Sequence, residues 1–263
     1  MRYPILLQLR FWCIIHCTLF AFSAPSVLSS GETQRQETYV YSFQYLGLTV
    51  AEGTITISDT LMDDGTSGKY MKTRATSLTA ASVLFRIDNK YSTLIDTATC
   101  LPLLYTKNIE QTNLSQGCHF QFDQKNLCIL SAEGEKISLA APTHNFFSAL
   151  YYMMNHTFQP KEILRLPVYA AGNIWEVRAE ALKTEMIATS IGTYRTVQVE
   201  IEFHRHSNFQ EQTRKTDVLT NRLLQEDVKT YLWFSATENG VVVKAEYELF
   251  PAGLRMMLAG YMK

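Results

Sequence analysis

The sequence predicts an all-β fold, namely a mainly antiparallel, strongly curved sheet or open β-barrel with one short helix near residues 144–155. From Glu37 onward, apolar and polar side chains alternate with a period of two, which is typical of half-buried strands. Turn-forming groups of Asp, Asn and Gly recur between these runs, at intervals that suit antiparallel strands. A helical pattern is clear in only one segment, so a fold built mainly of helices is excluded.

The N-terminal segment 1–29 has the composition of a secretory signal peptide. It contains two arginines, no acidic residue, an apolar run over residues 11–22 and then small residues, and Ser29 fits the last position before the cut. We therefore expect a single β-rich domain over residues 30–263, located in the periplasm of a Gram-negative cell. The alternative is an inner-membrane protein anchored by an uncleaved N-terminal segment, because residues 11–28 are about as long as a short membrane span needs.

The strands follow one another along the whole domain. The first contains four aromatic residues in alternation, Tyr39, Tyr41, Phe43 and Tyr45, and the second reads TITIS. Predicted strands cover residues 38–46, 49–58, 69–77, 90–96, 102–110, 118–122, 127–131, 163–168, 174–183, 194–203, 228–235 and 241–248.

The predicted helix starts after Thr143, His144 and Asn145, whose side chains can cap it. The run FFSALYYMMN follows, with no Gly or Pro before Pro160. The C-terminal run FPAGLRMMLAGYMK is rich in methionine and has no acid, and we interpret it as an adaptable apolar tail that docks on the barrel.

Three cysteines, Cys100, Cys118 and Cys128, remain once the signal peptide is removed. In an oxidising compartment one disulfide and one free thiol are expected, and Cys118 with Cys128 is the favoured pair because two short strands joined by a turn carry them. The alternative is three buried free thiols.

Several segments, taken in order, resemble a bacterial envelope family, domain of unknown function 3108. The clearest is LFRIDNKYSTLIDTATCLPLLY (84–105), and QYLGLTVAEGTITI (44–57) is similar to the family's opening hairpin. FFSALYYMMN resembles its helix, and LRLPVYAAGNIWEVRAEAL (164–182) resembles a strand pair. Ala51 stands where the family usually has a second Gly, which concerns turn geometry only. The resemblance implies an exported β-rich domain, and the family has no agreed activity.

Composition and motifs exclude several classes of function. With 24 basic and 25 acidic side chains, the chain lacks the positive charge that nucleic-acid binding requires. It has neither of the common glycine-rich phosphate-binding motifs, so we expect no nucleotide cofactor. His204 and His206 share a strand face but would need a third ligand to bind a metal, and we predict no metal site.

Candidate catalytic groups also have simpler structural explanations. Ser148 lies four residues after His144, a spacing that fits a shared helix face, but no third group is evident to orient the histidine. The pairs Asp88 with Asp96 and Glu200 with Glu202 fit strand ends and solvent-facing positions. We therefore predict no catalytic residues and a protein that is not an enzyme.

The feature that stands out is aromatic content, with 14 Tyr, 14 Phe and 3 Trp. A curved sheet lined by aromatic residues can enclose an apolar ligand, and we name Phe43, Tyr45, Trp175 and Trp233 as candidate contacts. The leading hypothesis is an envelope protein that binds an apolar or lipid-like ligand or a lipidated partner. The alternative to a ligand cavity is an aromatic core that is filled by its own side chains. The alternative functions are an assembly factor for envelope proteins, which acts through protein contacts, and a hydrolase of envelope polymers.

Overall fold

The protein is described by a computed structural model that covers residues 35–62, 64–83, 85–205, 217–225, 228–237, 240–247 and 253–263. These residues form one continuous sheet of 15 strands with three short helices, which confirms the predicted fold class. The strands are β1 (Gln36–Tyr45), β2 (Leu48–Leu61), β3 (Ser67–Ser77), β4 (Ile87–Asp96), β5 (Pro102–Gln111), β6 (Leu114–Asp123), β7 (Cys128–Ser131), β8 (Lys136–Ser138), β9 (His144–Asn145), β10 (Ile163–Ala170), β11 (Asn173–Thr189), β12 (Gly192–Arg205), β13 (Thr230–Ser235), β14 (Val242–Tyr247) and β15 (Leu254–Met262). The helices are α1 (Thr79–Ser82), α2 (Phe146–Met154) and α3 (Val218–Leu223).

The strand order is β8-β7-β6-β5-β4-β3-β2-β1-β15-β14-β13-β12-β11-β10-β9. All neighbouring strands are antiparallel except β9 and β10, which pair in parallel. The first and last strands, β1 and β15, are hydrogen-bonded to each other in the middle of the sheet. The C-terminal run that we interpreted as an apolar tail is therefore a strand that joins two halves of the sheet.

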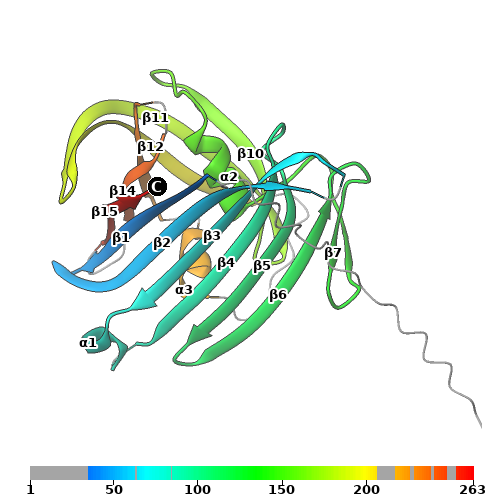
Figure 1. The fold of residues 1–263 in the computed structure, drawn as a ribbon, viewed down its shortest axis with the longest axis horizontal. Helices are drawn as coiled ribbons and strands as arrows, with labels where there is room; N and C mark the ends of the chain where they lie inside the picture. Colours follow the sequence, from blue (N-terminus) through cyan, green and yellow to red (C-terminus); the bar gives the residue numbers. More distant parts are fainter. Residues whose placement is uncertain are drawn as a thin grey trace, which may run out of the picture.

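The sheet is strongly curved, and β-bulges contribute to the bending. Irregular register occurs in β1 between Val40 and Tyr41 and again between Phe43 and Gln44, and in β11 between Ala181 and Lys183. Each bulge adds a local bend and twist to its strand. Figure 1 shows the result, a sheet rolled around its own concave face, with the long β11–β12 hairpin curling over one side.

The two edges of the sheet, β8 and β9, do not pair with each other, so the barrel is open. Aromatic packing draws the two halves together nearby, because the Tyr169 ring lies 5.4 Å from that of Phe120 and 6.2 Å from that of Phe122. Gln124 adds polar contacts across this seam, donating from Nε2 to the Thr143 carbonyl (2.9 Å) and accepting at Oε1 from the Thr143 amide (3.1 Å).

The predicted helix is present as α2, inside the rolled sheet (Figure 1). Asn145 caps it, because its side-chain oxygen accepts from the amides of Phe147 (3.0 Å) and Ser148 (2.8 Å). The Asn145 Nδ2 donates to Thr93 Oγ1 on β4 (3.3 Å), which ties the start of the helix to the opposite half. At the far end of α2, a Cβ at residue 240 would lie 2.2 Å from the Met154 carbonyl, so only glycine fits there.

Candidate ligand-binding site

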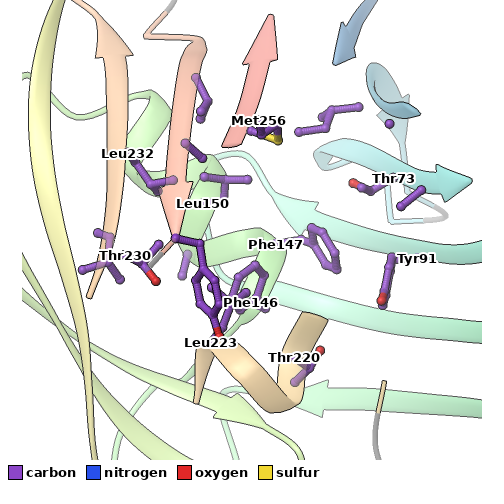
Figure 2. A pocket seen from close by; sticks show the side chains of 18 of the residues that line it. Thr73, Tyr91, Phe146, Phe147, Leu150, Thr220, Leu223, Thr230, Leu232 and Met256 are labelled. Carbon is purple, nitrogen blue, oxygen red and sulfur yellow. The ribbon is translucent and has the colours of Figure 1, made fainter. Parts of the chain in front are cut away.

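The concave face of the sheet holds a partly open cavity of about 250 Å³ (Figure 2). Every strand from β1 to β5 and from β10 to β15 contributes to its wall, together with α2 and α3. Almost all of the surface that lines it is apolar. A dry apolar cavity of about 150 Å³ is already large enough to bind benzene, so this one has room for a larger apolar group.

Strand alternation and one glycine shape the wall at β1 and β2. Tyr41 and Phe43 on β1 both line the cavity, and Tyr41 is only 1% exposed. The Phe43 ring lies against the backbone of Gly53 on β2, where a Cβ would be 2.7 Å from Phe43 Cε2. Gly53 therefore lets the aromatic ring lie flat on the neighbouring strand.

The helix α2 supplies the opposite wall, with five cavity-lining residues. Its first turn carries two aromatic rings, of which Phe147 packs 4.8 Å from the ring of Tyr91 and Phe146 stacks 6.2 Å from that of Phe203. Figure 2 shows Phe146 and Phe147 beside each other within the cavity, with Leu150 on the next turn of the helix.

The short helix α3 covers a further part of the cavity through Thr220 and Leu223. A buried polar cluster holds its start in place, because the Asp217 Oδ1 accepts from the Tyr91 hydroxyl (3.1 Å) and from the Thr220 amide (2.8 Å). The Asn89 Nδ2 donates to the same Tyr91 hydroxyl (3.1 Å). The polar cluster thus fixes α3 against β4 at the edge of the apolar space.

Burial keeps three tyrosines of the cavity, Tyr41, Tyr91 and Tyr105, neutral. It raises the pKa of the Tyr41 and Tyr105 phenols well above the ordinary value of 10. The pKa of Tyr91 is raised for the same reason and also by the neighbouring Asp217 carboxylate. These hydroxyls are therefore hydrogen-bonding groups without charge at physiological pH.

Of the four aromatic residues predicted as ligand contacts, only Phe43 lines the cavity. Tyr45 comes after the β-bulge of β1 and is not part of the wall. Trp175 is buried beside the cavity, where its Nε1 donates to the Ala170 carbonyl (3.1 Å). Trp233 lies on the other face of β13, where its Nε1 donates to Glu185 Oε1 (2.7 Å) and Lys244 Nζ lies 4.1 Å from its ring centroid.

The sequence prediction did not single out the side chains of α2, α3 and β13 to β15 that complete the wall. Phe146 and Phe147 could have been found from the predicted helix, which carries four Phe and Tyr residues and one histidine close to one another in the sequence. Leu254 and Met256 could not, because their run has the composition of an apolar tail rather than the pattern of a strand.

The structure does not contain the predicted disulfide between Cys118 and Cys128, and Cys100 is not disulfide-bonded either. The register explains why: Cys128 on β7 lies opposite Asp123, five residues along β6 from Cys118. At about 3.3 Å per residue, the two cysteines are on the order of 16 Å apart along the strand, too far for a disulfide.

The histidines and carboxylates weighed as candidate catalytic groups have structural partners. His144 and Ser148 belong to the cap of α2, with Nδ1 and Oγ 3.3 Å apart, and burial lowers the pKa of His144 to about 4. His204 Nε2 lies 3.5 Å from Glu202 Oε2, while His206 lies outside the described residues. Among the residues that the structure describes, no three His, Cys, Asp or Glu side chains are grouped so that they could hold a metal ion.

The candidate carboxylate pairs are also engaged in ion pairs or turns. Arg74 donates to both oxygens of Asp88 (2.8 and 3.1 Å), and this lowers the pKa of that carboxyl. Asp96 accepts from the Thr99 hydroxyl (2.6 Å) in a turn. Glu200 pairs with Lys229 (3.0 Å) and Glu202 with Arg178 (2.9 Å).

The predicted signal peptide lies outside the described residues. In the part of the chain that the structure describes, no helix has the length and apolar character needed to cross a membrane.

Comparisons with known proteins place these observations in a family and a fold. The sequence model of a family described as "Protein of unknown function (DUF3108)" matches residues 38–259. No curated protein matches the chain. A solved structure of a β-barrel-like protein of the domain of unknown function DUF1849, from Brucella abortus, is similar with a TM-score of 0.55 and 7% sequence identity, over 86% of this chain and 96% of that one.

A second solved structure, of a candidate exported protein with a YmcC-like fold from Bacteroides fragilis, gives a TM-score of 0.32 and 14% identity, over 86% of this chain and 95% of that one. At such low identities, only the β-barrel-like fold is carried over, and it comes from the first of the two structures.

Proposed function

Because this chain belongs to the DUF3108 family of proteins of unknown function, its function has to be argued from its own site, and we propose that it is an exported, non-enzymatic protein that binds an apolar or amphipathic ligand within its curved sheet. The observation that carries this proposal is the cavity of about 250 Å³ and its nearly continuous apolar wall. A filled aromatic core, the simplest alternative, would leave no such space.

Binding would be driven by the area that the ligand buries. Each 100 Å² of apolar ligand surface removed from water contributes about 2.5 kcal/mol, before the cost of ordering the ligand. The wall is already held in shape by the sheet, by the capped α2 and by the Tyr91–Asp217 contact, so little further ordering of the protein is required.

The assembly-factor alternative receives less support. Strand addition to a partner needs an exposed sheet edge, and the edge strands β8 and β9 have only three and two residues. The helix α2, which could have offered a face to a partner, packs inside the sheet with five of its residues buried.

The periplasm remains the expected location, on the strength of the composition of residues 1–29. Retention of an uncleaved segment in the membrane would keep the same domain beside the inner membrane, where apolar ligands are abundant. The binding proposal does not depend on which of the two applies.

The test is to purify the protein from the periplasm without detergent and to analyse organic extracts by mass spectrometry. A matched pair of variants makes the result specific: Ala245→Phe fills the cavity, since Ala245 lines it, whereas Ala188→Phe adds the same ring at an exposed position of β11 away from it. We expect a stoichiometric apolar molecule with the wild type and with Ala188→Phe, and its loss with Ala245→Phe.

Empty extracts from a folded wild-type protein would not yet exclude binding, since a ligand can be lost in purification. A second measurement, the fluorescence of the neutral apolar dye N-phenyl-1-naphthylamine, covers that case. If the dye also responds equally to all three proteins, the proposal is wrong.

A further inference from the structure

Two hydroxyl groups in the wall of the cavity have no hydrogen-bond partner among the described residues, the phenol of Tyr41 and the Oγ1 of Thr73. Both oxygens are buried, and the whole Tyr41 side chain is 1% exposed. Native proteins leave few buried polar groups unpaired, because each one forfeits its hydrogen bonds to water. Two of them in one apolar cavity indicate that the partner arrives with the ligand.

The two hydroxyls belong to the same wall. Tyr41 on β1 lies opposite Gly53 of β2, and Thr73 on β3 lies opposite Ile55 of β2. Tyr41 and Thr73 therefore lie on either side of β2. Their partners on β2, Gly53 and Ile55, are two residues apart and so are consecutive positions on the same face. Figure 2 shows the Thr73 hydroxyl turned towards the middle of the cavity.

A third hydroxyl provides the contrast. Tyr91 also lines the cavity, but its oxygen donates to Asp217 and accepts from Asn89, so its hydrogen bonds are made within the protein. The protein can therefore supply hydrogen-bond partners to a buried phenol in this region, as it does for Tyr91. Tyr41 and Thr73 are left for another partner.

The charge at the wall indicates what that partner is. The charged residues of the lining are Arg74 and Glu246. The Arg74 guanidinium is held by both oxygens of Asp88, and the Glu246 carboxylate pairs with Lys244 (2.8 Å) and Arg255 (2.9 Å). Among the described residues that line the cavity, no unpaired charge is left to balance a ligand charge buried beside Tyr41. Burying an unpaired charge is far more costly than burying a neutral polar group.

We infer that the ligand is amphipathic, with an apolar chain that fills the cavity and an uncharged polar group, of the ester or alcohol class, that pairs with the hydroxyls of Tyr41 and Thr73. This inference rests on the proposed function, which it narrows from apolar ligands in general to chains with a neutral polar group. Both hydroxyls can donate to a carbonyl oxygen, and both can accept from an alcohol.

The experiment measures displacement of N-phenyl-1-naphthylamine by three probes of similar length: methyl decanoate, dodecane, and decanoate in its charged form at pH 8. The wild type is compared with Tyr41→Phe and Thr73→Val. Tyr39→Phe is the matched control, because Tyr39 is on the same strand but outside the cavity wall and its hydroxyl donates to Glu37 Oε2 (2.8 Å).

In each of the two variants we expect methyl decanoate to bind more weakly while dodecane binds as before. The dissociation constant of dodecane divided by that of methyl decanoate should therefore fall about fivefold to tenfold, as for the loss of one neutral hydrogen bond. It should stay unchanged in Tyr39→Phe and in Thr73→Ser, which keeps a hydroxyl. Both cavity variants remove a hydroxyl without a protein partner, so they should fold with at least wild-type stability.

Two results would overturn the inference while leaving the proposed function intact. One is an unchanged ratio in Tyr41→Phe and Thr73→Val, with both neutral probes still displacing the dye. The other is tighter binding of decanoate than of its methyl ester. If the folded wild type takes up neither the dye nor any probe, the proposed function itself fails.

Discussion

At the residue scale, the missing Cβ of Gly53 creates the space in which the Phe43 ring lies. We expect Gly53→Ala to push this ring out of place and to lower the free energy of unfolding by about 1 to 3 kcal/mol, the usual cost of overpacking. Urea denaturation of the single variant, of Phe43→Leu and of the double variant measures the effect, and the two changes should be coupled because the smaller Leu removes the clash.

Gly117→Ala is the control for this prediction, since no heavy atom lies within 4 Å of a Cβ at Gly117 on β6. It should be neutral or slightly stabilising, because alanine restricts the unfolded chain more than glycine does. Equal effects of the two substitutions would mean that Gly53 has no special contact with Phe43.

The lowered pKa of His144 should make the stability of the protein depend on pH. Burial lowers its pKa from 6.5 to about 4 in the folded protein, so between these pH values the unfolded chain binds a proton that the folded protein does not. The free energy of unfolding should therefore fall as the pH drops from about 6.5 to about 4, by an amount on the order of 3 kcal/mol.

Urea denaturation between pH 7 and pH 4.5 tests this expectation. His144→Gln should flatten the slope, whereas His119→Gln should keep it, since His119 lies on an exposed part of β6. Parallel slopes for the wild type and His144→Gln would show that His144 does not cause the loss of stability.

At the element scale, the stability of the short helix α2 depends mainly on the contacts of the residue that precedes it, Asn145. Asn145 caps the helix and also reaches Thr93 on β4. Asn145→Ala removes both contacts and should cost about 2 kcal/mol, while Asn145→Asp keeps the cap and loses only the donor to Thr93.

Thermal unfolding of the two variants, followed by circular dichroism, should therefore place Asn145→Asp between Asn145→Ala and the wild type. Asn113→Ala, in the exposed turn between β5 and β6, is the control and should leave the melting temperature unchanged. If Asn145→Asp is as unstable as Asn145→Ala, the contact with Thr93 rather than the cap holds the helix.

The elements that the sequence predicts correctly are those with strong local signals. The alternating β1 and the α2 run between Asn145 and Pro160 are recognisable because side-chain spacing alone determines them. The sequence does not predict the strand β15, because Met, Ala and Gly obscure its alternation and only one of its positions is fully buried. Its pairing with β1 joins the two ends of the described chain, and no local sequence pattern indicates such a distant pairing.

The residues of the candidate site likewise divide into those that a local sequence pattern predicts and those that it does not. Phe43 is found from its place on an aromatic strand, whereas Trp175 and Trp233, named as aromatic residues on later strands, lie outside the cavity wall. Alternation assigns a residue to one of two faces, but the β-bulges and the order of strands decide which inward positions surround the empty space. The unpaired hydroxyls of Tyr41 and Thr73 become visible only when the partners of every buried oxygen are known.

At the scale of the whole molecule, β15 holds the two halves of the sheet together. A chain that ends at residue 252 would lack β15, and it would expose both β1 and β14 as unpaired edges. We expect this truncation to lose cooperative unfolding and to aggregate, as measured by circular dichroism and size-exclusion chromatography. Removal of Lys263 alone, which follows the last paired residue, Met262, should change neither. A monomeric truncated chain with a cooperative transition would contradict this assignment.

The pairing of β1 with β15 also makes the sheet an antiparallel meander in circular form, apart from the parallel pair of β9 and β10. Read from β9 through β15 and then from β1 to β8, every strand lies beside its predecessor in this cyclic order. Thr38 lies opposite Met262, so a short linker could connect the ends of β1 and β15 as an ordinary hairpin. Circular permutation with new termini between β8 and β9 would convert the most distant pairing of the chain into a local one and speed folding, because less of the chain has to be closed into a loop.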